Sequence, residues 1–402
     1  MTLQDQDETL TFPLPLAELH GPAPALDALR ESRPVAPVRF PDGSTGYVAT
    51  GYDEVRRVLV DPRFSRAAAA AAEAQQGGLA VLANDSILGM DPPEHTRLRR
   101  LVAGAFTARR VEALRPRVTA IVDELLGDLA RRDPPADLVE GFSLPLPVRV
   151  ICELLGVSAA DQHVFHGWSD TVMGSLDRDP AEAQAAAAEL AGYFATLIAQ
   201  KRAHPTDDLI TALIAARDEQ DRLSEHELVV LCLGLLIAGH ETTANQINMF
   251  VVTLLHFPEV LDRLRADPDA VPHHVEELLR FVQLGDSGTT VPRVTTEDVE
   301  LGGVTIPAGS VVLPAIGVAN RDPRAFPTPE RLDLDRLEIP HLTFGVGAHH
   351  CLGAQLARVE LQEALHGILR HLPGLRLAVP ESELRFKPGM IVRSLESLPV
   401  AW

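Results

Sequence analysis

The sequence predicts a mainly α-helical protein with a smaller lobe that contains β-strands. Apolar residues recur at helical spacing through residues 111–217 and 225–256, in runs that begin and end at Pro, Ser or acidic residues. Short segments rich in β-branched residues supply the strand signal. They lie near residues 36–50, 290–313 and 384–400.

No linker-like stretch, block of charge or internal repeat divides the 402 residues. We therefore expect a single domain over residues 1–402, with a disordered N-terminus at residues 1–12. Hydrophobic residues make up 46% of the chain and charged residues 23%, which is enough apolar material for a large core. The formal net charge of -20 argues against non-specific binding to nucleic acid or to an anionic membrane.

Three cysteines in so long a chain do not form the framework of a secreted disulfide protein. Cys152 and Cys232 lie in apolar helical runs, where buried and unreactive thiols are expected. The acidic N-terminus lacks the features of a signal peptide, and the apolar run 228–239 is too short to cross a bilayer, so we read it as part of a core helix. We expect a cytoplasmic, monomeric protein.

The N-terminal part alternates helical signals, at Ala25–Ser32 and Asp53–Val60, with an extended signal at Tyr47–Thr50. The alanine-rich run 67–74 has helix propensity, but the glycines and the Asn-Asp-Ser cluster that follow it predict a long adaptable loop over residues 67–90. Loops of this length often serve as lids or binding loops.

A helix begins after Asp91-Pro92-Pro93-Glu94 and carries several basic side chains. At about 100° per residue, His95 and Arg99 share one face, whereas Arg97 and Arg100 point roughly the opposite way. The first face could hold an anion and the second could meet a partner. A solvated basic face is the simpler alternative.

The helix predicted over residues 225–256 carries Ala238-Gly239-His240-Glu241-Thr242-Thr243 near its middle. Glycine and threonine weaken a helix there, and the hydroxyl of Thr242 is spaced to bond to the carbonyl of Ala238, four residues earlier. Two readings stay open. One is a local opening that admits a small ligand, with Glu241 and Thr242 placed to handle protons, and the other is a polar patch that faces solvent.

A glycine-rich loop, Phe344-Gly345-Val346-Gly347-Ala348-His349-His350-Cys351-Leu352-Gly353, runs into a helical pattern that begins at Ala354. Its glycines permit a tight turn and the close approach of something flat or bulky. A thiol at a helix N-terminus meets the positive end of the helix dipole, which favours the thiolate. From these residues alone, Cys351 is a metal ligand or a nucleophile.

Four motifs, in this order, resemble those of the cytochrome P450 family, specifically of its soluble bacterial members, and the resemblance covers essentially the whole chain. They are residues 238–243, Glu277-Leu278-Leu279-Arg280, Pro329-Glu330-Arg331-Leu332 and residues 344–353. The segments 91–100 and 395–399 resemble members that tailor polyketides and other secondary metabolites. Leu332 departs from the aromatic residue usual in the family, and His349 stands where many members carry Arg.

The resemblance implies a P450 fold with haem b as cofactor and Cys351 as its axial thiolate, which favours O–O cleavage. Thr242, with Glu241, would deliver protons during oxygen activation. Glu277, Arg280 and Arg331 would form a buried ion-pair network. The residues implied to contact the cofactor are His95, Arg99, Arg293, His349, Phe344, Gly345 and Cys351, the first four of them at the haem propionates.

The implied reaction is the insertion of one oxygen atom from dioxygen into a C–H bond or an alkene of an apolar small molecule, such as a macrolide or another polyketide. The sequence has no dinucleotide or flavin fingerprint, so the implied electron donor is a separate ferredoxin with its NAD(P)H-dependent reductase. Arg97 and Arg100, with Arg109 and Arg110, are candidates for its docking patch. The residues implied to line the substrate pocket are Leu88, Leu235, Ala238, Gly239, Thr289, Val291, Met390 and Ile391.

Three alternatives remain from the sequence. A P450-type enzyme that uses peroxide directly would not need the Glu241-Thr242 pair, and a haem-binding sensor without catalysis would not need it either. A non-haem metal site built from His349, His350 and Cys351 lacks a spaced partner to complete a tetrahedral set.

Overall fold

The computed structural model describes residues 9–12, 14, 18–74, 85–158, 161, 167–168, 171, 180–218, 223–285, 291–388, 390 and 392–402. The chain forms two compact units, each assembled from two separate stretches of sequence. The first unit contains residues 1–69 and 279–350, and the second contains residues 70–278 and 351–402. The largest sheet lies in the first unit and the long helices lie in the second, which confirms the predicted mainly α-helical class with a β-containing lobe. The expectation of one domain over residues 1–402 stays a prediction.

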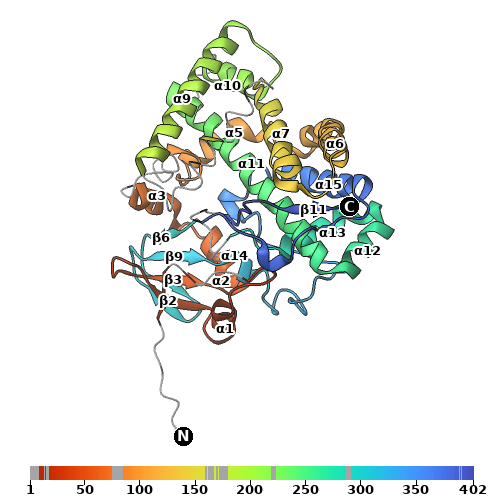
Figure 1. Ribbon diagram of the computed structural model, residues 1–402. Coiled ribbons are helices and arrows are strands. Elements are labelled where there is room, and N and C mark those ends of the chain that lie inside the picture. The colour runs from red at the N-terminus through yellow and green to blue at the C-terminus, as the bar shows by residue number, and fades with distance from the viewer. Residues whose placement is uncertain are drawn as a thin grey trace. The chain divides into compact units, whose positions relative to one another are not determined.

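A six-stranded sheet forms the framework of the first unit (Figure 1). The strand order is β1-β2-β3-β9-β6-β4. Strands β3 and β9 pair in parallel, with Tyr47 opposite Val312, so backbone hydrogen bonds hold the two stretches of this unit together. The strands are β1 (Leu10–Thr11), β2 (Val35–Arg39), β3 (Thr45–Ala49), β4 (Phe64–Ser65), β6 (Arg293–Thr295) and β9 (Val311–Pro314).

A hairpin in the same unit joins β7 (Val299–Leu301) to β8 (Val304–Ile306), within the strand segment expected near residues 290–313. Gly302 and Gly303 form its turn with positive φ angles of 55° and 78°, which a type I′ turn requires at both positions. Helix α1 (Pro24–Ser32) packs on β2, and α2 (Tyr52–Val60) packs on β3, β9 and α14 (Ile316–Ala319). The buried side chains between these elements include Val35, Val55, Val58, Phe64, Val299, Leu301, Ile306 and Val312.

The start of the described chain differs from the disordered N-terminus predicted for residues 1–12. Leu10 and Thr11 form β1, and the Phe12 N–H donates to a carbonyl of β2 at 2.8 Å. Leu10 and Phe12 also pack on the core of the first unit. Alternating apolar side chains and an available sheet edge therefore order this segment, whereas residues 1–8 lie outside the described residues.

The second unit is a helical body, as predicted for residues 111–217 over the part that the structure describes. Helix α11 lies at its centre and packs against α7, α9, α10, α12 and α15 (Figure 1). A small sheet of order β10-β11-β5 lies in the same unit. The elements are α5 (Glu94–Ala103), α6 (Ala108–Ala130), α7 (Pro145–Leu155), α9 (Pro180–Ala203), α10 (Leu209–Asp218), α11 (Glu225–His256), α12 (Pro258–Ala266), α13 (Val271–Phe281, which continues into the first unit), α15 (Ala354–His371), β5 (Ala136–Asp137), β10 (Arg376–Leu377) and β11 (Pro399–Ala401).

Helix α11 has the bounds that the sequence predicted. A capping box begins it: the Ser224 hydroxyl accepts from the Glu227 N–H at 3.1 Å, and the Glu227 carboxylate accepts from the Ser224 N–H at 2.6 Å. The helix is long and apolar enough to cross a membrane, but 67% of its most apolar window is buried inside the protein. It is therefore a core helix, as expected.

The two cysteines in apolar helical runs are buried, Cys152 on α7 and Cys232 on α11. Burial raises the pKa of each thiol to about 12. A thiol with such a pKa holds its proton at neutral pH, so both cysteines are unreactive packing residues, as the sequence indicated.

The prediction of a long loop over residues 67–90 is wrong for the first residues of that range, because helix α3 spans Arg66–Ala74. Alanine is the strongest helix former, and the Ser65 hydroxyl accepts a hydrogen bond from the Ala68 N–H at 2.9 Å at the start of the helix. This local preference outweighs the glycines that follow in the sequence. Residues 75–84 lie outside the described residues.

Arg280 on α13 ties that helix to the irregular stretch 320–331. The side chain is buried, and its Nη1 donates to the carbonyls of Asn320 at 3.0 Å and Pro329 at 2.9 Å. Its Nη2 donates to the carbonyl of Arg331 at 2.9 Å. One guanidinium group thus satisfies three carbonyls that would otherwise need other donors.

The family resemblance implied a buried ion-pair network of Glu277, Arg280 and Arg331. Glu277 and Arg280 are buried, as that network requires, but Arg331 is not. The side chain of Arg331 is exposed, and the residue contributes its backbone carbonyl instead. The exposed guanidinium group of Arg331 keeps its hydration and so avoids a desolvation cost. Arg336, which no motif had marked, is a further buried arginine and donates to the carbonyl of Pro327 at 2.9 Å.

We predict that Arg280→Lys lowers the free energy of unfolding by several kcal/mol, because an ammonium group cannot reach all three carbonyls and each unsatisfied buried group costs about 1–3 kcal/mol. Urea unfolding followed by circular dichroism measures the loss. Arg331→Ala is the control, because it keeps the carbonyl and should change stability by no more than about 0.5 kcal/mol. Equal losses in both variants would contradict this account.

Glu360 on α15, in the second unit, is also a charged residue that is buried, with 2% of its surface exposed. Among the described residues its Oε2 atom has no hydrogen-bond partner. Burial raises the pKa of this carboxyl well above its usual range. Burial therefore favours the neutral form of the Glu360 carboxyl group in the folded protein.

We predict that Glu360→Gln raises the Tm at neutral pH. The folded protein takes up a proton that the unfolded chain releases above about pH 4.3, so the contribution of Glu360 to stability is fully present below that pH and is lost as pH rises toward the folded-state pKa. Calorimetry from about pH 4 to about pH 8 should show that the Tm of the variant exceeds that of the wild type by a margin that grows with pH. Glu363→Gln, which loses an ion pair with Arg115 of 2.7 Å, should lower the Tm; a pH-independent effect of Glu360→Gln would refute the prediction.

Candidate active site

Cys351 lies at the end of the glycine-rich loop, directly before α15. Gly345 and Gly347 turn this loop with φ angles of 65° and 78°, in the region that favours glycine. Gly347 also sits close to the main chain of α2, since a Cβ atom on it would lie 3.1 Å from the Leu59 carbonyl oxygen. The Cys351 side chain reaches the surface of the polypeptide, as a ligand for a bound group must.

Opposing effects act on the Cys351 thiol. Desolvation by the surrounding protein is the largest and raises its pKa, while the Gly353 N–H and the charges of Arg99 and Arg358 lower it. The net result is a raised pKa, so the free thiol is protonated, but a metal cation would ionise it and the same N–H and arginine groups would stabilise the thiolate.

Arg358 is a site residue that the sequence reasoning missed. It forms a bidentate ion pair with Glu276, with Nε to Oε1 at 2.7 Å and Nη2 to Oε2 at 2.9 Å. Such a pair fixes the guanidinium plane. Arg358 lies two helical turns beyond Cys351 along α15, and that spacing was the signal that could have identified it.

The inner face of α5 carries His95 and Arg99. His95 is buried and Arg99 is half-buried, whereas Arg97 and Arg100 are exposed, in agreement with the two faces expected from the spacing. Burial and the charge of Arg99 lower the pKa of His95. Burial also lowers the pKa of Arg99, against the effect of Cys351. An anion placed against this face would relieve both effects.

The middle of α11 is held by side chains that bond back to the helix. The bond from Thr242 to Ala238 is the one that the spacing predicted, and such bonds weaken a helix locally. The helix nevertheless runs unbroken through residues 225–256. The four bonds run from His240 Nδ1 to the carbonyl of Leu236 (3.0 Å), from Thr242 Oγ1 to Ala238 (2.8 Å), from Thr243 Oγ1 to Gly239 (3.2 Å) and from Asn245 Nδ2 to Glu241 (2.8 Å).

Glu241 and His240 are buried, so the reading of this segment as a polar patch that faces solvent is wrong for both. Asn245 Nδ2 lies 3.3 Å from Glu241 Oε2, and His240 Nε2 lies 3.4 Å from Glu241 Oε1. Asn245 and His240 were not among the predicted site residues. The spacing of Asn245, one turn after Glu241, was the available signal.

One face of α11 stays accessible although the rest of the segment is buried. Gly234, Leu235, Ala238, Gly239 and Thr242 are half-buried or exposed, and their spacing places them on one side of the helix. We call these five residues the open stripe. A Cβ atom on Gly234 would meet nothing within 4 Å. Gly239 lies against Ile151 of α7, and Thr242 lies at the inner end of the open stripe, before the buried residues Asn245 and Gln246.

The remaining predicted site residues lie in several settings. In the first unit, Arg293 is buried and its Nη1 donates to the carbonyls of Val291 at 2.9 Å and Pro292 at 3.1 Å. Phe344, Gly345 and His349 are half-buried. In the second unit, Met390 is buried and Leu88 is 48% exposed. Val291 is 41% exposed, and Thr289 and Ile391 lie outside the described residues.

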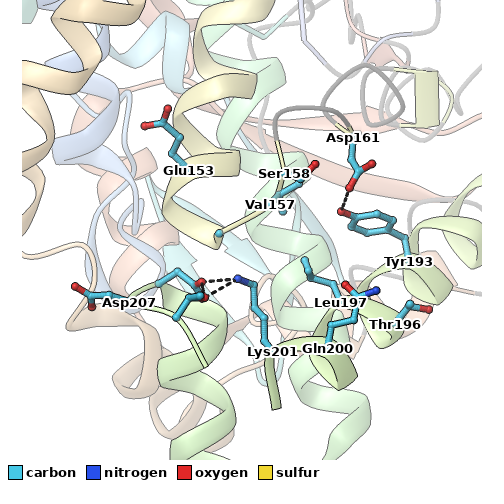
Figure 2. Close-up of a pocket in the computed structure, with 13 residues that line it drawn as sticks. Glu153, Val157, Ser158, Asp161, Tyr193, Thr196, Leu197, Gln200, Lys201 and Asp207 are labelled. Atoms are coloured by element: carbon cyan, nitrogen blue, oxygen red, sulfur yellow. Dashed lines mark hydrogen bonds and ion pairs between the residues drawn. The ribbon is translucent and has the colours of Figure 1, made fainter. Parts of the chain in front are cut away.

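A cavity of about 490 Å³ lies elsewhere in the second unit, between the end of α7, helix α9 and the segment before α10 (Figure 2). Its lining combines polar side chains with apolar ones such as Val157 and Leu197. The Tyr193 hydroxyl donates to Asp161 Oδ2 at 2.8 Å, and Lys201 forms a buried ion pair with Asp208. No predicted site residue lines this cavity.

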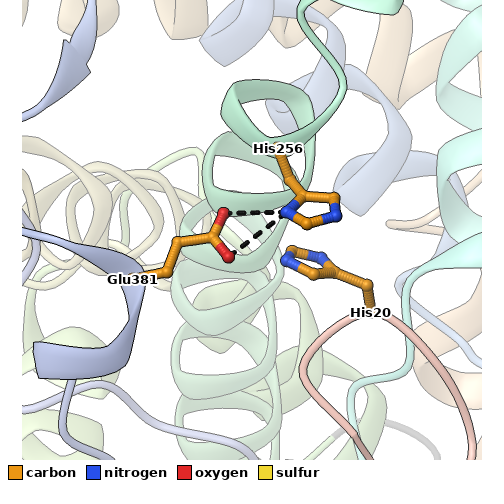
Figure 3. A group of neighbouring side chains, drawn as sticks. All are labelled: His20, His256 and Glu381. Carbon is orange, nitrogen blue, oxygen red and sulfur yellow. Dashed lines mark hydrogen bonds and ion pairs between the residues drawn. The ribbon is translucent and has the colours of Figure 1, made fainter.

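At the far end of α11, His256 Nδ1 lies 3.1 Å from Glu381 Oε1 (Figure 3). This pair is about 21 Å along the helix from Thr242, so it belongs to the helix terminus, where a positive charge is favourable. Among the described residues, no close group of three or more His, Cys, Asp or Glu ligand atoms includes Cys351. The alternative of a non-haem metal site at Cys351 therefore gains no support.

Comparison with known proteins agrees with this geometry. The family model for cytochrome P450 matches residues 148–374. The chain is 48% identical to mycinamicin IV hydroxylase/epoxidase of Micromonospora griseorubida, over 96% of this chain and 98% of that protein. It is 47% identical to nocardicin C N-oxygenase of Nocardia uniformis subsp. tsuyamanensis, over 98% of this chain and 99% of that protein.

Among solved structures, HinD, crystallised with NMFT and NO, superposes with a TM-score of 0.92 at 45% identity, covering 98% of this chain and 99% of that one. Such agreement over nearly the full length leaves the fold in no doubt. Cys351 at the start of α15 and the Glu241-Thr242 pair on α11 are the family's own motifs in this sequence. The chain therefore belongs to the cytochrome P450 family and is a P450 monooxygenase.

Proposed function

We propose that this enzyme hydroxylates or epoxidises an apolar secondary metabolite, such as a macrolide or another polyketide, with electrons supplied by a ferredoxin. The observation that carries the proposal is the open stripe of α11, which leads along small and aliphatic side chains to Thr242, beside the buried Glu241. A relative of 48% identity acts on the macrolide mycinamicin IV, as its name states. The proposal places the enzyme in the cytoplasm as a monomer.

Haem b, with Cys351 as axial ligand, fits the residues present. The thiol is the soft ligand that iron accepts, and Arg99 and Arg358 offset the charge of its thiolate. A Cβ atom on Gly353 would meet no atom within 4 Å, so the backbone beside the cysteine leaves room for a flat ring. When bound, this cofactor supplies the redox chemistry of dioxygen.

The inner face of α5 would hold the acidic side chains of the cofactor. His95 and Arg99 are desolvated there, so carboxylates would gain strong charge-assisted hydrogen bonds. The family resemblance assigns Arg293 and His349 to the same task. It also assigns Phe344 and Gly345 to contacts with the ring.

Thr242 and Glu241 would handle the protons that oxygen reduction consumes. Thr242 sits where the open stripe meets the buried part of α11, and its hydroxyl is held by the Ala238 carbonyl at 2.8 Å. Glu241 is next to it and shielded from solvent. A buried acid beside a hydroxyl at the edge of the substrate space can supply protons without admitting bulk water. This pair favours oxygen activation by reduction over direct use of peroxide.

The substrate would lie along the open stripe, against Leu235, Ala238 and Gly239. Leu88, Thr289, Val291, Met390 and Ile391 remain proposed contacts. A panel of macrolides and other polyketides, scored by the optical change that accompanies loss of iron-bound water and then by turnover, tests the substrate class. Absence of binding and product across the panel, with a normal carbon monoxide spectrum, would refute the polyketide assignment alone.

We predict that the reduced enzyme gives, with carbon monoxide, the far red-shifted Soret band of a thiolate-bound haem. Cys351→His should lose this band and lose monooxygenation, because imidazole does not supply the electron density of a thiolate. Cys152→Ser is the matched control, since that thiol is buried on α7 and unreactive. A red-shifted band retained in Cys351→His would overturn the ligand assignment.

The ferredoxin would dock on the exposed arginines of α5 and α6, namely Arg97, Arg100, Arg109 and Arg110. The net charge of -20 makes a local basic patch necessary for an acidic partner. Arg97 forms an ion pair with Glu227, which reduces its availability. Arg100 is therefore the better residue to change.

We predict that Arg100→Glu raises the ferredoxin concentration needed for half-maximal turnover by roughly tenfold at low salt, and that added salt narrows the difference. Steady-state turnover at varied ferredoxin concentration measures it. Arg131→Glu makes the same charge change just beyond the other end of α6, where Arg131 pairs with Asp128, and should have little effect. Similar effects of the two substitutions would argue against this docking face.

A further inference from the structure

His240 precedes Glu241 and points away from the open stripe, toward the buried side of α11. Its side chain is completely buried, and its Nδ1 atom lies 3.0 Å from the carbonyl oxygen of Leu236. A carbonyl oxygen only accepts hydrogen bonds, so Nδ1 carries a hydrogen. A neutral imidazole in this tautomer presents a lone pair at Nε2.

That Nε2 atom lies 3.4 Å from Glu241 Oε1, although the two atoms are not aligned for a hydrogen bond as the side chains stand. Both side chains are buried, so a lone pair opposite an ionised carboxylate would be unfavourable there. One proton, on Nε2 or on the carboxyl group, makes the contact attractive. Asn245 Nδ2 donates a hydrogen bond to the other carboxyl oxygen at 3.3 Å.

We infer that His240 is a positioning residue for Glu241, and that the two side chains hold one proton between them next to Thr242. This inference rests on the proposed role of Glu241 as the proton source. When Glu241 passes the proton toward Thr242, the pair keeps one negative charge, and a proton from solvent restores it. Without His240, the carboxyl group loses the partner with which it shares the proton.

The pair is tested without turnover by ¹⁵N NMR of the carbon monoxide complex with labelled histidine, in which His240→Gln assigns the His240 signals. In the wild type we expect the Nε2 signal at the position of a protonated or proton-sharing nitrogen. Glu241→Leu, and also Glu241→Gln, should move it to the position of a neutral acceptor. An Nε2 signal that neither substitution moves would overturn the inference.

The functional consequence is measured as product formed per NAD(P)H consumed, with a macrolide that the panel identifies. His240→Leu should lower this ratio by about tenfold, less than the loss expected on removing a general acid itself. His240→Gln should recover part of it, because its amide can donate to Glu241. His371→Gln, which breaks a similar pair of 2.9 Å with Asp123, should leave the ratio unchanged.

A purely structural His240 would give a lower Tm with an unchanged ratio, and that result would also overturn the inference. Failure of the proposed function would give a different result from failure of the inference about His240. In that case the wild-type protein would lack the red-shifted carbon monoxide band or would yield no product, and the NMR arm, run on the protein as isolated, would still decide whether His240 and Glu241 share a proton.

Discussion

Helix α11 buries a run of polar side chains in its middle, and those side chains need partners inside the protein because bulk water cannot reach them. Several find one in the helix itself, as Thr242 does at the carbonyl of Ala238 and Asn245 does at that of Glu241. Packing against α7, α9 and α15 keeps the helix continuous although these bonds weaken it. The same residues thereby leave one face of the helix open and keep a carboxyl group beside it.

The cysteine side of the second unit obeys a similar balance between burial and charge. Desolvation raises the pKa of the Cys351 thiol, and Arg99, Arg358 and the Gly353 N–H work against it. Neither desolvation alone nor the positive neighbours alone would suit a thiol that is to bind a metal. A fully solvated thiolate would be open to oxidation, and a buried thiol without positive neighbours would resist ionisation, as Cys152 and Cys232 do. The ion pair with Glu276 keeps Arg358 in place for this task.

Overall similarity fixes the chemistry of this enzyme better than its substrate. The names of two relatives of nearly equal identity, 48% and 47%, describe hydroxylation or epoxidation of mycinamicin IV and N-oxygenation of nocardicin C. The residues proposed for oxygen activation lie at fixed places on α11 and directly before α15. Substrate choice depends on the shape of the space in front of them, which loops and single side chains change without disturbing the fold.

The sequence by itself determined the features that follow from local rules. A capping box and apolar spacing set the bounds of α11, paired glycines set the β7–β8 turn, and glycines around one cysteine marked Cys351. Only the tertiary structure decided that Arg331 is exposed and offers its carbonyl, that Glu276 holds Arg358, and that His240 faces Glu241. The reason is physical: a local rule depends on neighbours along the chain, whereas burial and the partner of a long side chain depend on which distant residues pack beside it.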